Sequence, residues 1–217
     1  MLLLVAYFLV AGIGFCAWYW IAIRKTRQRA VEVVQWLQSA LSGQGQVTGI
    51  RWISSSRFRV PLRLKHGLFH RACILVELIP REVPLNWLLS RLNGRQETMT
   101  FQADLDLPPA FSLHVRNFRW FARSSRRTPS NRAGWRFEQA APVVISTRSD
   151  WQKELSTTVT AMAHRDSQEF LSIDFQRRSP HFSVTLPLEA IAPDSPTSTC
   201  LFDSMRELAS NSSASLF

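Results

Sequence analysis

The chain has 217 residues, of which 46% are hydrophobic, and its 26 basic and 16 acidic side chains give a net charge of +10. Its three cysteines, Cys16, Cys73 and Cys200, show no pairing pattern, which argues against a disulfide scaffold and fits a reducing compartment. The G-x-G-x-x-G, P-loop and G-x-S-x-G motifs are absent, so nucleotide chemistry is not indicated.

Residues 1–23 predict a transmembrane anchor. Residues 2–23 carry no charge over 22 positions, and as a helix they would extend roughly 33 Å, enough for the ~30 Å hydrocarbon core of a bilayer. A cleavable signal would begin with basic residues and have a shorter apolar core, and Phe15 before Cys16 disfavours a lipidation site. We therefore expect the anchor to be retained.

Positive charge follows the anchor at four positions: Arg24, Lys25, Arg27 and Arg29. The positive-inside rule then predicts an N-terminus outside the cell and a cytoplasmic domain, at the inner or plasma membrane. The aromatic residues 18–20 precede these cations, where their rings would lie at headgroup level. The four cations are candidate contacts for anionic lipid; the alternative is that they serve only as a topology signal.

Residues 24–43 predict a juxtamembrane amphipathic helix that continues from the anchor and ends at Gly43 and Gly45. Its apolar stripe comprises Ala30, Val33, Val34, Leu37 and Leu41. Such a stripe requires a partner, so we expect contact with another protein or self-association through this stalk and the anchor. Gly12 and Cys16, at i, i+4 spacing, would allow two spans to approach closely.

Residues 44–192 predict one soluble domain of the α+β class, with an antiparallel β-sheet and two helices. Residues 57–65 alternate apolar and basic side chains, and Pro61 on the polar side suggests an edge strand. Residues 72–79 are more continuously apolar than residues 57–65 and predict a central strand. A short amphipathic helix follows and closes at Asn93-Gly94; its apolar residues are Leu85, Leu88, Leu89 and Leu92.

Segments 69–118 and 134–188 resemble one another. Each contains a strand, a helix, a strand that begins with Gln-Glu, and a return strand that begins with Pro-x-Phe-Ser. The second helix is expected to begin at Ser149. This pattern predicts an internal duplication of two β-α-β-β units, and the alternative is a chance similarity of two amphipathic hairpins.

The most basic stretch, residues 107–137, contains no acid. Its arginines and aromatic residues have the chemistry of surfaces that meet phosphates and stack on bases or headgroups. The candidate contact residues are Arg116, Arg119, Trp120, Phe121, Arg123, Arg126, Arg127, Arg132, Trp135 and Arg136. Anionic lipid is favoured over nucleic acid because no nucleic-acid-binding motif accompanies them; a solvated loop is the alternative.

Two sets of residues have enzymatic chemistry. His66, His70 and Cys73 are of metal-ligating types, but one H-x3-H without a second ligand cluster does not predict a metal site. Asp104 and Asp106 share a strand face and could act as an acid–base pair, although solvent-facing positions explain them more simply. We therefore predict no catalytic, metal or cofactor site.

Residues 193–217 are rich in Ser, Thr and Pro and predict a polar, flexible tail. Together these features predict a basic, single-pass membrane protein whose domain is a non-enzymatic binding or assembly module at the membrane surface. The expected partners are the lipid bilayer with its anionic headgroups and another protein or a second copy. The alternative is a membrane-tethered, hydrolase-like enzyme whose site is assembled from scattered residues.

Overall fold

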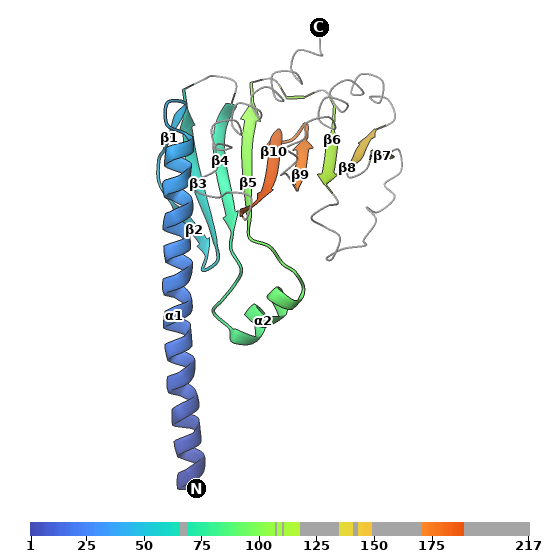
Figure 1. The fold of residues 1–217 in the computed structure, drawn as a ribbon. Coiled ribbons are helices and arrows are strands. Elements are labelled where there is room, and N and C mark those ends of the chain that lie inside the picture. Colours follow the sequence, from blue (N-terminus) through green and yellow to red (C-terminus); the bar gives the residue numbers. More distant parts are fainter. Residues whose placement is uncertain are drawn as a thin grey trace.

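Helix α1 runs from Leu2 to Ala40, and its upper half lies beside the sheet while its lower half projects away from the rest of the molecule (Figure 1). This computed structural model describes residues 1–65, 69–106, 108–109, 111–117, 135–140, 143–148 and 171–188. Within these residues the fold contains two helices and a ten-stranded sheet in which every pair is antiparallel. The predicted α+β class with an antiparallel sheet is confirmed.

The elements after α1 are, in chain order, β1 (Gly45–Val47), β2 (Arg51–Ser54), β3 (Arg57–Leu64), β4 (Phe69–Glu77), α2 (Pro84–Leu92), β5 (Thr98–Leu105), β6 (Leu113–Asn117), β7 (Trp135–Ala140), β8 (Val143–Arg148), β9 (Ser172–Phe175) and β10 (Phe182–Pro187). The strands lie in the order β1-β3-β4-β5-β10-β9-β6-β8-β7, with β2 also paired to β3.

The two halves of α1 lie in different surroundings. In the first half the apolar side chains are exposed; Leu3 is 88% and Val10 70% exposed, and this half is long and apolar enough to cross a membrane. In the second half the predicted stripe is buried in the core, and Leu37 is 0% exposed. The stripe therefore packs within its own chain, which corrects the expectation that it requires a separate partner.

The long helix ends three residues before Gly43, slightly earlier than the predicted boundary. The last helical residue is Ala40, and Gly43 follows at φ +94°, a conformation that is easy only for glycine. Gly45 then begins β1, and a Cβ at that position would lie only 2.8 Å from the carbonyl oxygen of Arg63. A left-handed turn and a close backbone approach thus join α1 to the sheet.

Pro61 lies inside the sheet, so the prediction that β3 is an edge strand is wrong. Strand β4 pairs with one side of β3, and β1 and β2 both pair with the other side. Thr48 N donates a hydrogen bond to Pro61 O (3.1 Å), which places the proline nitrogen on that same side, at the break between β1 and β2. A proline is tolerated there because the ladder is already interrupted.

Strand β4 is central, as its apolar run predicts. It lies between β3 and β5, and Ile74 and Val76 are 0% exposed. The core continues across β5, β10 and β9 through edge-to-face and tilted aromatic rings. Phe182 contacts Phe101 at 6.2 Å and Phe175 at 4.9 Å between ring centroids. The contact between Phe101 and Phe182 joins strands β5 and β10, which are more than 70 residues apart in the sequence.

The predicted duplication equates β5 with β9 and β6 with β10, but the two pairs of strands are arranged differently. Strands β9 and β10 pair with each other, whereas β5 and β6 are separated by β10 and β9. The second predicted helix, from Ser149, lies outside the described residues. The duplication therefore stays a prediction.

The burial of α1 in the core can be tested by truncating Leu37. We expect Leu37→Ala to lower the free energy of unfolding by about 2–5 kcal/mol, because it leaves a cavity between α1 and the sheet. Urea denaturation of the detergent-solubilised full chain, followed by tryptophan fluorescence, measures the change. Val31→Ala is the control, since Val31 lies on the same helix at 51% exposure and should change stability by less than about 1 kcal/mol. Equal effects of the two substitutions would contradict this packing.

Candidate functional site

Helix α2 does not bury its apolar side chains. None of its residues is buried, and its four leucines, hereafter the leucine face, are 47–74% exposed: Leu85, Leu88, Leu89 and Leu92. Pro84 opens the helix at its first turn, where a missing N–H costs nothing, and Asn93 caps its end. A short helix with this much exposed leucine is normally covered by another surface.

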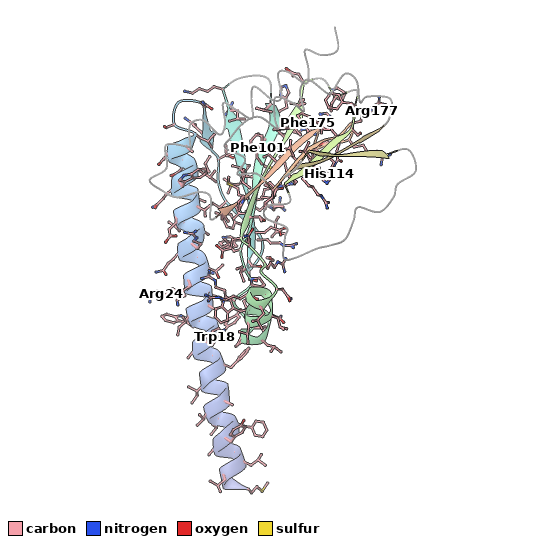
Figure 2. All side chains as sticks on the ribbon, turned by 45° about the vertical axis from the view of Figure 1, so that its right-hand side comes forward. Trp18, Arg24, Phe101, His114, Phe175 and Arg177 are labelled. Carbon is pink, nitrogen blue, oxygen red and sulfur yellow. The ribbon has the colours of Figure 1, made fainter. Side chains whose placement is uncertain are left out.

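Helix α2 is held against α1 at Trp18. The Trp18 Nε1 donates a hydrogen bond to the backbone carbonyl of Arg81 (3.0 Å), just before α2. The Trp18 ring also meets the Trp87 ring edge to face, with centroids 5.8 Å apart. Figure 2 shows Trp18 beside α2, with the first turns of α1 extending beyond it. The two contacts place α2 level with the aromatic end of the predicted anchor.

A cavity of about 770 Å³ lies between α1 and the β4–β5 connection that contains α2. We call it the interface cavity. The rings of Trp18 and Trp87 form part of its lining. Its charged lining consists of five cations and one acid: Lys25, Arg29, Arg81, Arg91, Arg95 and Glu97. The cavity is thus strongly electropositive, since only one carboxylate balances five cations.

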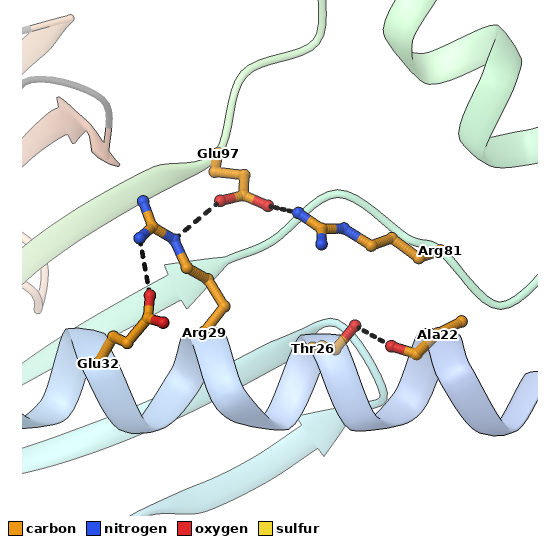
Figure 3. A network of polar contacts seen from close by, with 6 residues as sticks. All are labelled: Ala22, Thr26, Arg29, Glu32, Arg81 and Glu97. Carbon is orange, nitrogen blue, oxygen red and sulfur yellow. Dashed lines mark hydrogen bonds and ion pairs between the residues drawn. The ribbon is translucent and has the colours of Figure 1, made fainter.

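Glu97 organises the inner wall of the interface cavity. Its side chain is 12% exposed and lies between two arginines, with Arg81 Nη2 at 3.0 Å and Arg29 Nε at 3.7 Å (Figure 3). Arg29 also pairs with Glu32 at 2.9 Å, and one turn earlier the Thr26 hydroxyl donates to the carbonyl of Ala22. Because these contacts join α1 to both ends of the β4–β5 connection, they fix the position of that connection, and with it α2, relative to α1.

The other three cations of the cavity have no carboxylate partner among the described residues. Lys25, Arg91 and Arg95 form no ion pair there, and Arg91 instead lies over the Trp87 ring, 5.7 Å from its centroid. A cation on an aromatic face keeps most of its charge available to an anion. The cavity therefore offers uncompensated positive charge beside an apolar helix.

The predicted contact residues lie partly on α1, partly on β6 and β7, and partly outside the described residues. Arg24, Lys25, Arg27 and Arg29 lie on α1 between the exposed half and the buried half, but only Lys25 and Arg29 line the interface cavity. Arg24 lies over Trp20 on another side of the helix, and it lines a shallow hollow there together with Arg27. Of the predicted contact residues between 116 and 136, Arg116 is on β6, and Trp135 and Arg136 are on β7.

The other predicted contact residues between 116 and 136 lie outside the described residues: Arg119, Trp120, Phe121, Arg123, Arg126, Arg127 and Arg132. Sequence reasoning missed Arg81, Trp87, Arg91 and Arg95. A signal was present, because Trp87 and Arg91 at i, i+4 lie on the side of α2 opposite to the leucines. Nothing local to that segment indicates that α1 lies next to it.

The polar side of the sheet carries the residues with enzymatic chemistry. Both ring nitrogens of His114 are engaged, Nδ1 by Asp174 and Nε2 by Arg116, whose Nε donates to it at 2.7 Å. His70 pairs with Asp106 beyond the end of β5. Asp104 lies on β5, whereas Asp106 follows the last residue of that strand and pairs with His70, so Asp104 and Asp106 do not lie on one strand as the sequence suggests.

Cys73 lies on β4 near Arg59 and Asp104. Burial raises the pKa of the Cys73 thiol, an effect that Arg59 opposes and Asp104 reinforces. Its Sγ lies 3.9 Å from the Gln102 side-chain oxygen. A thiol that is protonated at neutral pH is a poor nucleophile.

His66 lies outside the described residues, and within them no three His, Cys, Asp or Glu side chains form a group that could hold a metal ion.

The state of Cys73 can be tested with Cys16→Ser and Cys200→Ser, which leave it as the sole cysteine. We expect its reaction with a disulfide reagent at pH 8 to be at least about tenfold slower in the folded protein than in urea, because the thiol is buried and its pKa is raised. Since the folded state holds this proton more tightly, stability should also fall as the pH rises above the ordinary thiol range. Equal rates in both states would show that Cys73 is accessible and ionisable.

Comparison with known proteins assigns the chain to no family: no known family model matches it, and no curated protein matches it. The described residues themselves bring three features to one level of the molecule. These are the aromatic end of an apolar helix, the leucine face of α2 and an electropositive cavity between them.

Proposed function

We propose that the protein is a single-pass membrane protein whose domain acts as a non-enzymatic binding or assembly module at the membrane surface. The observation that carries this proposal is the continuity of α1. One 39-residue helix supplies both the exposed apolar half and a core element of the domain. The domain would therefore stand on the bilayer without a flexible linker, at a fixed distance from it.

The orientation follows from the charges around the anchor. Arg24, Lys25, Arg27 and Arg29 lie at the domain side of the apolar half. The positive-inside rule favours retention of such a flank in the cytoplasm of a cell bounded by an inner or plasma membrane. Anionic headgroups of that leaflet would then lie against these cations. The arginine and aromatic residues at 116–136 remain candidates for contact with lipid or with a protein partner.

The polar side of the sheet favours a binding role over catalysis. His114 has both nitrogens engaged, and the raised pKa of Cys73 keeps its thiol protonated. The side chains there pair across strands, as Thr100 does with Thr185 (3.1 Å) and Arg57 with Glu77 (3.3 Å). Such cross-strand pairs stabilise the sheet. A sheet stabilised in this way is a suitable scaffold for presenting a surface to another protein.

The topology can be tested with single cysteines in a variant that lacks the three native cysteines. Ser42→Cys, at an exposed position on the domain, should react with a membrane-impermeant maleimide only after permeabilisation of the cells. A cysteine added ahead of Met1 should react in intact cells, because it would lie outside. Carbonate extraction should leave both variants in the membrane fraction. Reaction of Ser42→Cys in intact cells would overturn the orientation, and release by carbonate would overturn the anchor.

A further inference from the structure

The position of α2 relative to the apolar half of α1 indicates its depth in a bilayer. The helix extends beyond the Trp18 contact by residues 2–17, which is roughly 24 Å at 1.5 Å per residue. A hydrocarbon core is ~30 Å thick, so a span that starts at the outer boundary reaches Trp18 some 6 Å before the inner boundary. Interfacial helices lie with their apolar sides about 5–10 Å into this boundary. Helix α2 therefore lies at the depth of an interfacial helix.

The leucine face suits this depth. All four leucines are exposed, and helix geometry places them opposite to Trp87, the residue that contacts α1. They therefore point away from the protein, where a membrane at this level would supply lipid. Within the described residues no other element covers them.

The interface cavity lies on the domain side of the contact between Trp18 and Trp87, which would be at headgroup level in a bilayer placed in this way. It opens between Trp18 and the first cations of α1, and it contains Lys25, Arg91 and Arg95 without carboxylate partners among the described residues. Guanidinium groups bind phosphate through paired hydrogen bonds, and indole rings prefer the same interfacial zone. A volume of about 770 Å³ is in the range of pockets that hold small ligands.

We infer that the interface cavity binds the phosphate headgroup of an anionic phospholipid while the leucine face of α2 lies among the acyl chains of the same leaflet. The inference rests on the proposed function, because it requires the anchor to place the cavity at the bilayer. Arg91 and Arg95 hold the phosphate from the α2 side and Lys25 from the α1 side. Glu97 keeps Arg29 and Arg81 in place by pairing with both. The lipid thereby joins the anchor to α2.

Lipid binding can be measured by native mass spectrometry of the delipidated full chain in detergent micelles. We expect phosphatidylglycerol to bind at least about tenfold more tightly than phosphatidylcholine, and this preference to fall about tenfold in the double variant Arg91→Gln, Arg95→Gln. The matched control is Arg51→Gln, Arg63→Gln, which removes the same charge from exposed positions of β2 and β3 and should change binding less than about twofold.

Three outcomes would overturn the inference. These are equal binding of the two lipids, an equal loss in the control variant, and displacement of the lipid by millimolar inorganic phosphate, which would indicate a site for free anions. Carbonate extraction of the same variants separates this inference from the proposed function. If every variant stays in the membrane while lipid preference is absent, the lipid site is wrong and the anchor holds; if the wild-type chain is extracted, the anchor itself is wrong.

The depth of α2 has an independent readout. In a variant without native cysteines, Leu89→Cys labelled with an environment-sensitive fluorophore should emit at shorter wavelength in vesicles than in urea and be quenched by spin-labelled acyl chains. Ser42→Cys carries the label at an exposed position of the domain and should show neither effect. Water-like emission at Leu89→Cys in vesicles that retain the protein would show that the leucine face is not inserted.

Discussion

The architecture depends on one constraint, which is that a single long helix carries both an exposed apolar half and a half that is buried in the core. The residues of α1 from Ala30 onward are part of the core, so the helix cannot rotate or slide without leaving cavities beneath Leu37. The apolar half is the same rigid rod, and its side chains are exposed. If the apolar half spans a bilayer as proposed, its depth and tilt would be imposed on the sheet, and contacts made by the sheet would in turn affect the depth and tilt of the apolar half.

The exposed apolar half and the buried half of α1 meet at residues 18–29, where aromatic rings give way to cations within about three turns of helix. The β4–β5 connection leaves the sheet and reaches this part of α1, to which it is tied by Trp18 and by the pairs of Glu97 with Arg29 and Arg81. A partly buried carboxylate between two arginines is a costly arrangement unless both pairs are kept. This cost explains why the connection has a defined place rather than trailing in solvent.

The periodicity of apolar residues predicts the helices and strands themselves better than it predicts which elements pack against them. The alternation in β3, the apolar run of β4 and the stripe from Ala30 to Leu41 each specify an element and its buried side, because helices and strands repeat at different periods. The same patterns do not say what covers a buried side. The stripe of α1 suggested a separate partner although the chain's own sheet covers it, and Pro61 suggested an edge although it lies at a break between β1 and β2.

The candidate site shows the same limit. The cations that follow the apolar half were visible, because charge next to a hydrophobic span is a local signal. Arg81, Arg91 and Arg95 join them only through the fold, which brings residues about 60 positions apart into one cavity. Even the amphipathic segment 84–92 could not indicate its location, since four leucines on one side of a short helix serve equally well against a sheet, a partner or a lipid surface.

Approximate free energies of burial indicate what α2 would contribute to membrane attachment in addition to the proposed anchor. Full burial of a leucine stabilises by about 1.5–3 kcal/mol, so four leucines that are each roughly half exposed or more would together gain on the order of 5 kcal/mol in lipid. A lone transmembrane helix tilts by about 20° on average at little cost. Because α2 lies to one side of α1, tilting away from it would withdraw these leucines from the bilayer and lose a gain many times the thermal energy of about 0.6 kcal/mol. If α1 spans a membrane as proposed, the main effect of α2 would be on orientation: it would restrict the tilt and rotation of the domain and keep the same side of the sheet at the same angle to the membrane.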